Sequence, residues 1–220
     1  MIKKLLMLFK IGRKLSSSGA ISSVYEIYNP PIVIKLLFFI VGFNLGNKKK
    51  YEDLSPETKL CNALQEMGTT FIKLGQFLAT RPDIIGDKIA KELERLQDKL
   101  PAFDLIQAKT ILKKELGERN FEKIKNISNP IAAASIAQVH FATIETSDNK
   151  KNVAIKILRP NIEKIFNEEL DALMLLAYIV QNLVKKTKRL KLIEIVQLLR
   201  EITNVEMDLR FEAAAANELY

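Results

Sequence analysis

Residues 132–140, AAASIAQVH, and residues 153–158, VAIKIL, are two short runs rich in Ala, Val and Ile. Around them, the segments Ile136–Ile144 and Asn152–Leu158 are separated by the polar stretch Thr146–Lys151. Short β-prone runs joined by a polar turn predict a β-hairpin. Helical patterns lie before and after the hairpin, so the order of helices, hairpin and helices predicts an α+β fold.

The AAASIAQVH stretch has the spacing of a loop that covers nucleotide phosphates, G-x-G-x-x-G-x-V, with the glycines replaced. Ala132, Ala134 and Ala137 stand at the glycine positions, and Val139 holds the valine position. Glycine permits positive φ and close backbone approach, whereas alanine restricts both. A nucleotide bound here is therefore expected in an altered pose. The candidate cofactor-binding residues are Ala132, Ala133, Ala134, Ser135, Ala137, Val139, Ala154 and Lys156.

The helices flanking the hairpin are expected at residues 57–80, 84–100, 104–116, 161–184 and from 191 to near the end of the chain. Ser55-Pro56-Glu57 has the serine cap and early proline of a helix start. Gly117 is the expected stop of the third helix. The basic segment Lys185–Arg189 is expected to be a solvated break.

A narrow polar stripe runs along the first of these helices. At 100° per residue, Thr69, Lys73, Gln76 and Thr80 lie within about 60° of one another, opposite a leucine-rich face. Gly68 and Gly75 share a flank and would allow another backbone to approach closely. The pattern fits a helix largely covered by protein with its stripe aimed at a specific partner, and it equally fits an ordinary amphipathic helix.

The positive charge of the chain is confined to its N-terminal arm. Residues 1–50 contain nine Lys or Arg and one acid, which accounts for the whole net charge of +8. The neutral remainder excludes a nucleic-acid-binding domain, which would spread basic residues over its surface. The apolar run 32–45 is shorter than the roughly 20 residues of a membrane span. We expect the arm to lie on an anionic membrane surface with Lys48–Lys50 at the headgroups; a basic helix packed on the domain, a signal peptide and a mitochondrial presequence are alternatives.

Four motifs together resemble the UbiB family of atypical protein-kinase-like proteins, which is associated with ubiquinone biosynthesis. Lys73–Gln76, KLGQ, followed by FLATRPDII, is similar to the family's K-x-G-Q signature. AAASIAQVH resembles its alanine-rich loop, and VAIK resembles its third-strand lysine motif. Residues 206–218, EMDLRFEAAAANE, resemble its E-x-D segment and the glutamate helix that follows. The motifs occur in the family's order between residues 51 and 218.

The resemblance implies a protein-kinase-like N-lobe, with a small antiparallel sheet and helices, preceded by a helical K-x-G-Q extension. We divide the chain accordingly into a basic arm (1–50), the K-x-G-Q extension (51–128) and a partial N-lobe with inserted helices (129–220). In the family, the alanine loop and the K-x-G-Q helix are thought to restrain protein phosphorylation and to favour ATP binding or hydrolysis coupled to lipid work. We expect the polar stripe to close over the nucleotide site.

The implied catalytic residues are Lys73, Gln76, Lys156, Glu206, Asp208 and Glu212. Lys156 can neutralise nucleotide phosphates if a carboxylate fixes its position, and Glu212 is the candidate. On one straight helix Glu206 and Glu212 point about 120° apart, so they should serve different partners, and the resemblance pairs Glu206 with Lys73. Asp208 and Glu212 would share a face, where a nearby cation would relieve their repulsion. His140 has no metal-ligand spacing and is expected to be structural.

Neither an H-R-D-like nor a D-F-G-like motif occurs in the sequence. The resemblance therefore implies an N-terminal portion without a C-lobe, with ATP as cofactor and Mg²⁺ ligands expected from a missing C-lobe. The implied partners are a separate chain carrying that lobe, an anionic membrane surface, and quinone-biosynthesis proteins or lipid. The implied location is the cytoplasmic face of a bacterial inner membrane, or a mitochondrion. A non-catalytic membrane-associated helical module, or a truncated remnant, is the alternative. The single cysteine, Cys61, excludes an internal disulfide and fits a reducing compartment.

Overall fold

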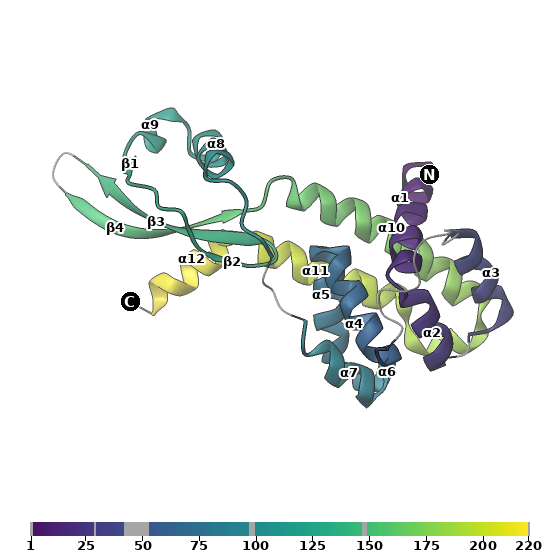
Figure 1. The fold of residues 1–220 in the computed structure, drawn as a ribbon. Coiled ribbons are helices and arrows are strands. Elements are labelled where there is room, and N and C mark those ends of the chain that lie inside the picture. Colours follow the sequence, from purple (N-terminus) through teal and green to yellow (C-terminus); the bar gives the residue numbers. More distant parts are fainter. Residues whose placement is uncertain (1, 29, 42–52, 97–99, 147–148, 220) are drawn as a thin grey trace. The chain divides into compact units, whose positions relative to one another are not determined.

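The computed structural model describes residues 2–28, 30–41, 53–96, 100–146 and 149–219 (Figure 1). The predicted α+β class is confirmed, because helices accompany a four-stranded antiparallel sheet. The chain divides into two compact units, Met1–Gln97 with Lys164–Val205 (unit 1) and Asp98–Glu163 with Glu206–Tyr220 (unit 2). Both units are discontinuous in sequence, whereas the ranges 1–50, 51–128 and 129–220 are contiguous; those ranges stay a prediction.

Unit 1 is helical. Its elements are α1 (Ile2–Ser17), α2 (Ala20–Tyr28), α3 (Ile32–Val41), α4 (Pro56–Met67), α5 (Thr69–Ala79), α6 (Pro82–Ile85), α7 (Asp87–Leu93), the 3₁₀ helix η2 (Lys185–Leu190) and most of α10 (Ile162–Leu183) and α11 (Leu192–Met207). The first two residues of α10 and the last two of α11 belong to unit 2. The predicted start of α4 is confirmed, since the Ser55 hydroxyl accepts the Thr58 N–H at 3.2 Å. The expected break after residue 184 is a 3₁₀ turn.

Glycines divide the two helices that the periodicity predicted at residues 57–80 and 84–100. Gly68 has φ 100° and separates α4 from α5, and Gly86 has φ 87° and separates α6 from α7, which ends at Leu93. These left-handed conformations favour glycine and interrupt the helical hydrogen-bond ladder. The prediction of two uninterrupted helices is therefore wrong, and a single 100° wheel does not apply across Gly68.

Gly75 allows a close approach, but of side chains. A Cβ on Gly75 would overlap Leu96 Cδ1 and would lie 3.1 Å from Leu64 Cδ1. Gly68 has open space around its Cα and is instead required for its backbone angle. The expectation that this glycine pair admits a neighbouring backbone is wrong, because one glycine makes room for leucines and the other ends a helix.

The basic N-terminal helices pack against the rest of unit 1. Leu8 and Ile11 of α1 and Ala20 of α2 are buried, and Lys4 Nζ lies 3.0 Å from Asp171 Oδ2 of α10. The Tyr28 hydroxyl donates to the Ile85 carbonyl at 2.8 Å, and burial raises the pKa of Tyr28 to about 12. Packing of a basic helix on the domain, one of the alternatives for the arm, is thus observed.

Several large apolar side chains of this N-terminal region are exposed. Ile32, Leu36 and Phe39, at helical spacing along α3, are exposed, as is Leu6 of α1. None of the described helices is long and apolar enough to span a bilayer. The predicted headgroup residues Lys48–Lys50 lie outside the described residues. Contact with a membrane surface stays a prediction.

Unit 2 contains the sheet, with α8 (Leu105–Leu116), α9 (Glu118–Phe121) and α12 (Leu209–Glu218). The strands are β1 (Ile124–Lys125), β2 (Pro130–Ala133), β3 (Ala137–Glu145) and β4 (Lys150–Leu158). The predicted hairpin is confirmed as β3 and β4, which pair along their whole length, and β1 and β2 pair with separate stretches of β3. The predicted third helix is confirmed as α8, with Gly117 at its end.

The core of unit 2 lies between α8 and one face of the sheet. Ala108 and Leu112 of α8 pack with Ile157 of β4, and Ile155 lies against this cluster. Successive side chains of a strand point to opposite faces, so Lys156 projects from the other face. In Figure 1, α8 lies above the sheet and α12 below it. The alternation of isoleucine and lysine in β4 thus directs Lys156 away from the core.

The helix predicted from residue 191 to near the end of the chain is two helices. α11 ends at Met207, Asp208 has ψ 87°, and α12 starts at Leu209. Glu206 and Glu212 therefore lie on different helices. The angle of about 120° predicted for one straight helix does not apply to them.

Candidate functional site

Lys156 and Glu212 form an ion pair within unit 2. Lys156 Nζ, on β4, lies 2.5 Å from Glu212 Oε2, on α12. The Lys156 side chain is 34% exposed and that of Glu212 is 59% exposed. The predicted partner of Lys156 is confirmed, and the lysine cation is held in one position while remaining accessible to a ligand.

The strand register brings most of the other candidate nucleotide residues to the face that carries Lys156. Val139 lies opposite Lys156, and Ala137 lies opposite Leu158. Ala132 pairs with Val139, and Ala154 precedes Lys156 by two positions on β4. Directly opposed residues of antiparallel strands share a face. Five of the candidates, Ala132, Ala137, Val139, Ala154 and Lys156, therefore share one surface of the sheet.

The tip of the alanine-rich loop is folded into unit 2. The Ala134 N–H donates to the Ala137 carbonyl at 2.8 Å, which leaves Ser135 and Ile136 at the turn. Ser135 is 1% exposed and Ile136 is 7% exposed. Ala133 lies opposite the buried Gln138, on the face away from Lys156. Ala133 and Ser135 are therefore placed away from the surface that those five candidates share.

Two residues that the sequence did not single out hold this loop and the segment before α8. Arg159 donates through Nε and Nη2 to the Ala134 carbonyl, at 3.1 and 2.7 Å. The Gln138 side chain accepts the Phe103 N–H at 2.9 Å and donates to the Phe103 carbonyl at 3.1 Å. No spacing rule marks either residue. For Arg159, the only available signal was its position as a cation directly after the strand that carries Lys156.

His140 is fully buried, and both of its ring nitrogens are engaged. Nδ1 donates to the Ser128 carbonyl at 2.8 Å, so Nε2 accepts from Gln138 Nε2 at 2.8 Å. The prediction that His140 is structural is confirmed. Within the described ranges there is also no cluster of three His, Cys, Asp or Glu side chains that could hold a metal ion.

Asp208 caps α12 and is paired with a neighbouring arginine. Its carboxylate accepts the Arg210 N–H at 3.1 Å and the Arg210 guanidinium at 2.7 and 2.5 Å. The hydrogen bond from the Arg210 side chain lowers the pKa of Asp208. Because Asp208 precedes the helix, it does not share a helical face with Glu212, and that expectation is wrong. The cation beside Asp208 is Arg210.

The K-x-G-Q residues lie in unit 1. Gln76 Nε2 donates to the Leu96 carbonyl at 3.3 Å, and this bond connects α5 to the stretch that follows α7. Lys73 is partly buried on α5. Its predicted partner Glu206 belongs to unit 2. The Lys73–Glu206 pairing, and closure of the stripe over the nucleotide site, stay predictions.

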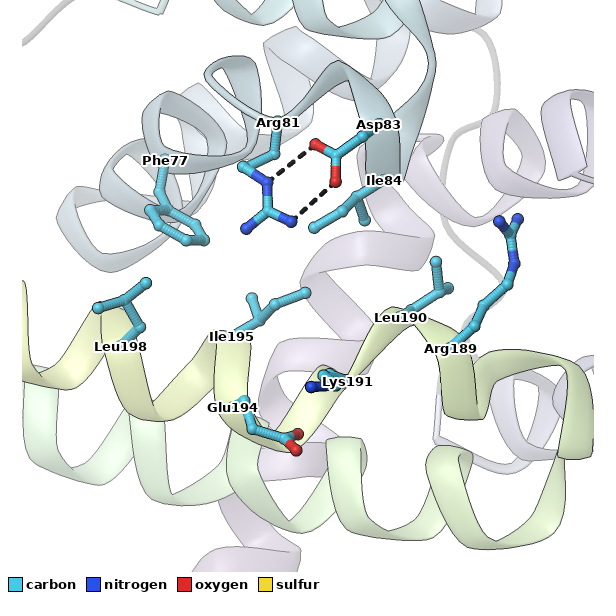
Figure 2. Close-up of a pocket in the computed structure, with 10 residues that line it drawn as sticks. All are labelled: Phe77, Arg81, Asp83, Ile84, Arg189, Leu190, Lys191, Glu194, Ile195 and Leu198. Carbon is cyan, nitrogen blue, oxygen red and sulfur yellow. Dashed lines mark hydrogen bonds and ion pairs between the residues drawn. The ribbon is translucent and has the colours of Figure 1, made fainter.

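Unit 1 also contains an open cavity of about 290 Å³ (Figure 2). On one side Arg81 and Asp83 form a two-pronged ion pair, with both donor–acceptor distances 2.8 Å. Phe77, Ile195 and Leu198 supply apolar walls, and Figure 2 shows Phe77 on the side opposite Ile195 and Leu198. None of the predicted site residues lines it.

Comparison with known proteins agrees with these features. Residues 95–220 match the ABC1 atypical kinase-like domain. Over 190 residues the chain is 37% identical to a probable protein kinase UbiB from Marinobacter nauticus, a match that covers 86% of this chain and 34% of that relative. The chain thus spans about a third of the length of the curated relative it matches. No solved structure matches the chain.

The small antiparallel sheet with its helices is consistent with a kinase-like N-lobe, and no C-lobe is present among the described residues. The matched region contains the alanine-rich loop, the lysine strand and the glutamate helix in the expected order. Both the domain match and the identity over most of the chain confirm the resemblance that the motifs indicated. The chain therefore belongs to the UbiB-type ABC1 family of atypical kinase-like proteins.

Proposed function

We propose that this chain is the nucleotide-binding N-lobe portion of an atypical kinase or ATPase that supports ubiquinone biosynthesis at a membrane. The observation that carries the proposal is the Lys156–Glu212 ion pair, which stands on the same sheet face as Ala132 and Ala137 of the loop. A lysine on a strand, fixed by a glutamate from a helix, is the arrangement that protein kinases require for phosphoryl transfer.

The residues present fit the nucleotide but not its metal ion. Lys156 would neutralise phosphate charge, Glu212 would hold the ammonium in position, and Val139 and Ala154 would provide an apolar surface beside it. The described residues contain no group of carboxylates suited to Mg²⁺. Kinases take these ligands from D-F-G-like and catalytic-loop motifs, which this sequence lacks. We therefore expect the Mg²⁺ ligands from a C-lobe.

The membrane part of the proposal rests on the arm. The excess charge of +8 lies in residues 1–50, beside the exposed apolar side chains of α3. Basic and apolar residues together favour binding to an anionic lipid surface. The cytoplasmic face of a bacterial inner membrane, with quinone-biosynthesis proteins or lipid as further partners, fits this arrangement. The same feature favours the second candidate function, a membrane-associated helical module without activity of its own.

Nucleotide affinity separates the two functions. A fluorescent ATP analogue should bind the 220-residue chain, and Lys156→Met should weaken binding by at least about tenfold, as expected for loss of a charge-assisted contact. Lys151→Met, a change of another exposed lysine of the same strand, is the matched control and should bind as the unaltered chain does. Absence of binding by the unaltered chain, with and without Mg²⁺, would favour the non-catalytic module.

A further inference from the structure

The turn at the tip of the alanine-rich loop lacks the local chemistry that usually stabilises a tight hairpin. Two-residue turns between antiparallel strands favour glycine or asparagine in conformations with φ above zero. Here the tip residues are Ser135 and Ile136. Among the described non-glycine residues, positive φ occurs at Asn126, Asn161 and Lys191, and so at neither tip residue. The conformation of this turn must depend on contacts from elsewhere in the fold.

Arg159 supplies those contacts. Its N–H donates to the Ile136 carbonyl at 2.8 Å, and its guanidinium donates twice to the Ala134 carbonyl. The same guanidinium reaches the Pro101 carbonyl at 2.9 Å and the Leu100 carbonyl at 3.3 Å. All of these acceptors are main-chain oxygens. One side chain therefore joins the loop to the segment that precedes α8.

That segment is itself fixed to the sheet. Gln138 of β3 holds both main-chain groups of Phe103, and Phe103 packs against the core of unit 2. The carbonyls that Arg159 contacts at residues 100 and 101 thus belong to a supported stretch of backbone. Arg159 is partly buried, and this burial lowers its pKa. A guanidinium nevertheless stays protonated, so the anchor persists across the ordinary pH range.

Arg159 lies close to Lys156 in the sequence and contacts the loop, so it connects the two. The two residues are separated only by Ile157 and Leu158, at the end of β4. A contact from Arg159 to the loop therefore sets where the alanine residues stand relative to the Lys156 ammonium. A freely moving phosphate loop has an exposed tip, whereas Ser135 and Ile136 are buried here. The geometry describes a loop held in place by the protein's own contacts.

We propose that Arg159 is a positioning residue, which anchors the alanine-rich loop beside Lys156 in the conformation that accepts a nucleotide. The nucleotide part of this proposal rests on the proposed function, and the anchoring part does not. Because these contacts already order the loop, binding avoids the cost of ordering it. Loss of the anchor should weaken nucleotide binding without removing any group expected to contact the nucleotide.

The anchoring is tested by amide hydrogen exchange in the full chain. Arg159→Gln should speed exchange of the Ala134 amide at least about tenfold, because that amide is protected by the turn that Arg159 holds. Arg159→Lys, which can reach fewer carbonyls than the planar guanidinium, should give an intermediate rate. Arg119→Gln, at an exposed arginine of α9, should leave the rate unchanged. Equal exchange in Arg159→Gln and the unaltered chain would overturn the proposal, and Arg159→Lys decides the matter if Arg159→Gln does not fold.

The positioning role is tested with the fluorescent ATP analogue. Arg159→Gln should bind about tenfold more weakly, Arg159→Lys should lie between, and Arg119→Gln should match the unaltered chain. Faster loop exchange with unchanged nucleotide affinity would leave Arg159 a structural residue and overturn the positioning role. If the unaltered chain binds no nucleotide, the proposed function and the nucleotide part fail together, while the exchange rates still decide whether Arg159 anchors the loop.

Discussion

Lys156 and Glu212, 56 residues apart in the sequence, meet at 2.5 Å between Nζ and Oε2. One side chain projects from β4 on the face away from the α8 core, and the other comes from the first turn of α12. Both are partly exposed, so solvent screens their attraction and the pair contributes at most about 1 kcal/mol to stability. We infer that the pair serves mainly to orient the lysine.

Removal of the Glu212 charge should therefore affect binding more than stability. Glu212→Gln is expected to lower the free energy of unfolding by less than about 1 kcal/mol, while nucleotide affinity falls because the Lys156 ammonium loses its fixed position. Denaturant titration and analogue binding measure the two effects. Glu218→Gln, at the exposed end of the same helix, is the control.

A double-mutant cycle sharpens this test. If Glu212 acts through Lys156, then the affinity losses of Glu212→Gln and Lys156→Met should be strongly non-additive. Additive losses would show that the two side chains act on the nucleotide independently.

Asp208 offers a test that separates a capping role from a charge role. Asparagine and aspartate are both good N-caps, whereas alanine is not. Asp208→Asn should therefore preserve the helicity of α12, and Asp208→Ala should reduce it, as measured by NMR chemical shifts of residues 209–213. If Asp208 also contributes its charge to nucleotide binding, Asp208→Asn should weaken affinity with the helix intact; full affinity in Asp208→Asn would limit the residue to capping.

A methyl group added at Gly75 should lower stability, because it would displace the side-chain ends of two buried leucines. Gly75→Ala places a Cβ against Leu96 and Leu64, and overpacking of this kind costs roughly 1–3 kcal/mol. Thermal unfolding of the variant should show a corresponding fall in melting temperature. Adding Leu96→Ala should recover part of the loss, because it removes the nearer methyl group. If the double variant loses as much stability as the two single variants lose together, Leu96 is not the source of the strain.

The Tyr28 hydroxyl should lose its proton at a higher pH than an ordinary tyrosine. Partial burial of the side chain raises its pKa to about 12, against an ordinary value of 10.0, although the residue as a whole is 47% exposed. Its contribution to stability is complete below pH 10, because both states then hold the proton. It is lost as the pH rises toward 12, because the unfolded chain releases the proton first. Ultraviolet titration should show a phenolate step near pH 12 that Tyr28→Phe removes. Persistence of that step in Tyr28→Phe would assign it to another tyrosine.

The exposed face of α3 should be required for membrane binding. A variant with Ile32→Glu, Leu36→Glu and Phe39→Glu introduces three acids on one helical face and should no longer float with anionic phosphatidylglycerol vesicles. The control adds the same charge at exposed positions elsewhere in unit 1, through Tyr178→Glu, Asn182→Glu and Gln197→Glu. Flotation of the unaltered chain should weaken with salt, because each basic residue near the surface contributes about 1 kcal/mol. Equal flotation of both triple variants would contradict a role for α3.

The sequence by itself determined the elements that depend on local pattern. The β-prone runs of 136–144 and 152–158, with a polar turn between them, were sufficient to predict β3 and β4. Ser55 and Gly117 marked helix ends through capping chemistry that acts within a few residues. The chain order of four motifs was sufficient to indicate the family. Strand alternation also placed Lys156 and the isoleucines beside it on opposite faces.

Tertiary structure decided what local pattern leaves open. Periodicity alone did not reveal the breaks at Gly68 and Asp208, because apolar residues at helical spacing continue across Gly68 and no glycine or proline lies near Asp208. Arg159 and Gln138 were not identified because they bind main-chain carbonyl and amide groups of distant segments. Every residue has such groups, so no residue type or spacing indicates which of them will be bound. The angle between Glu206 and Glu212 changed with the break at Asp208, since a wheel describes only one uninterrupted helix. Hydrogen-bond partners far apart in sequence are chosen by the folded chain as a whole, and so only the fold could identify the residue that anchors the alanine-rich loop.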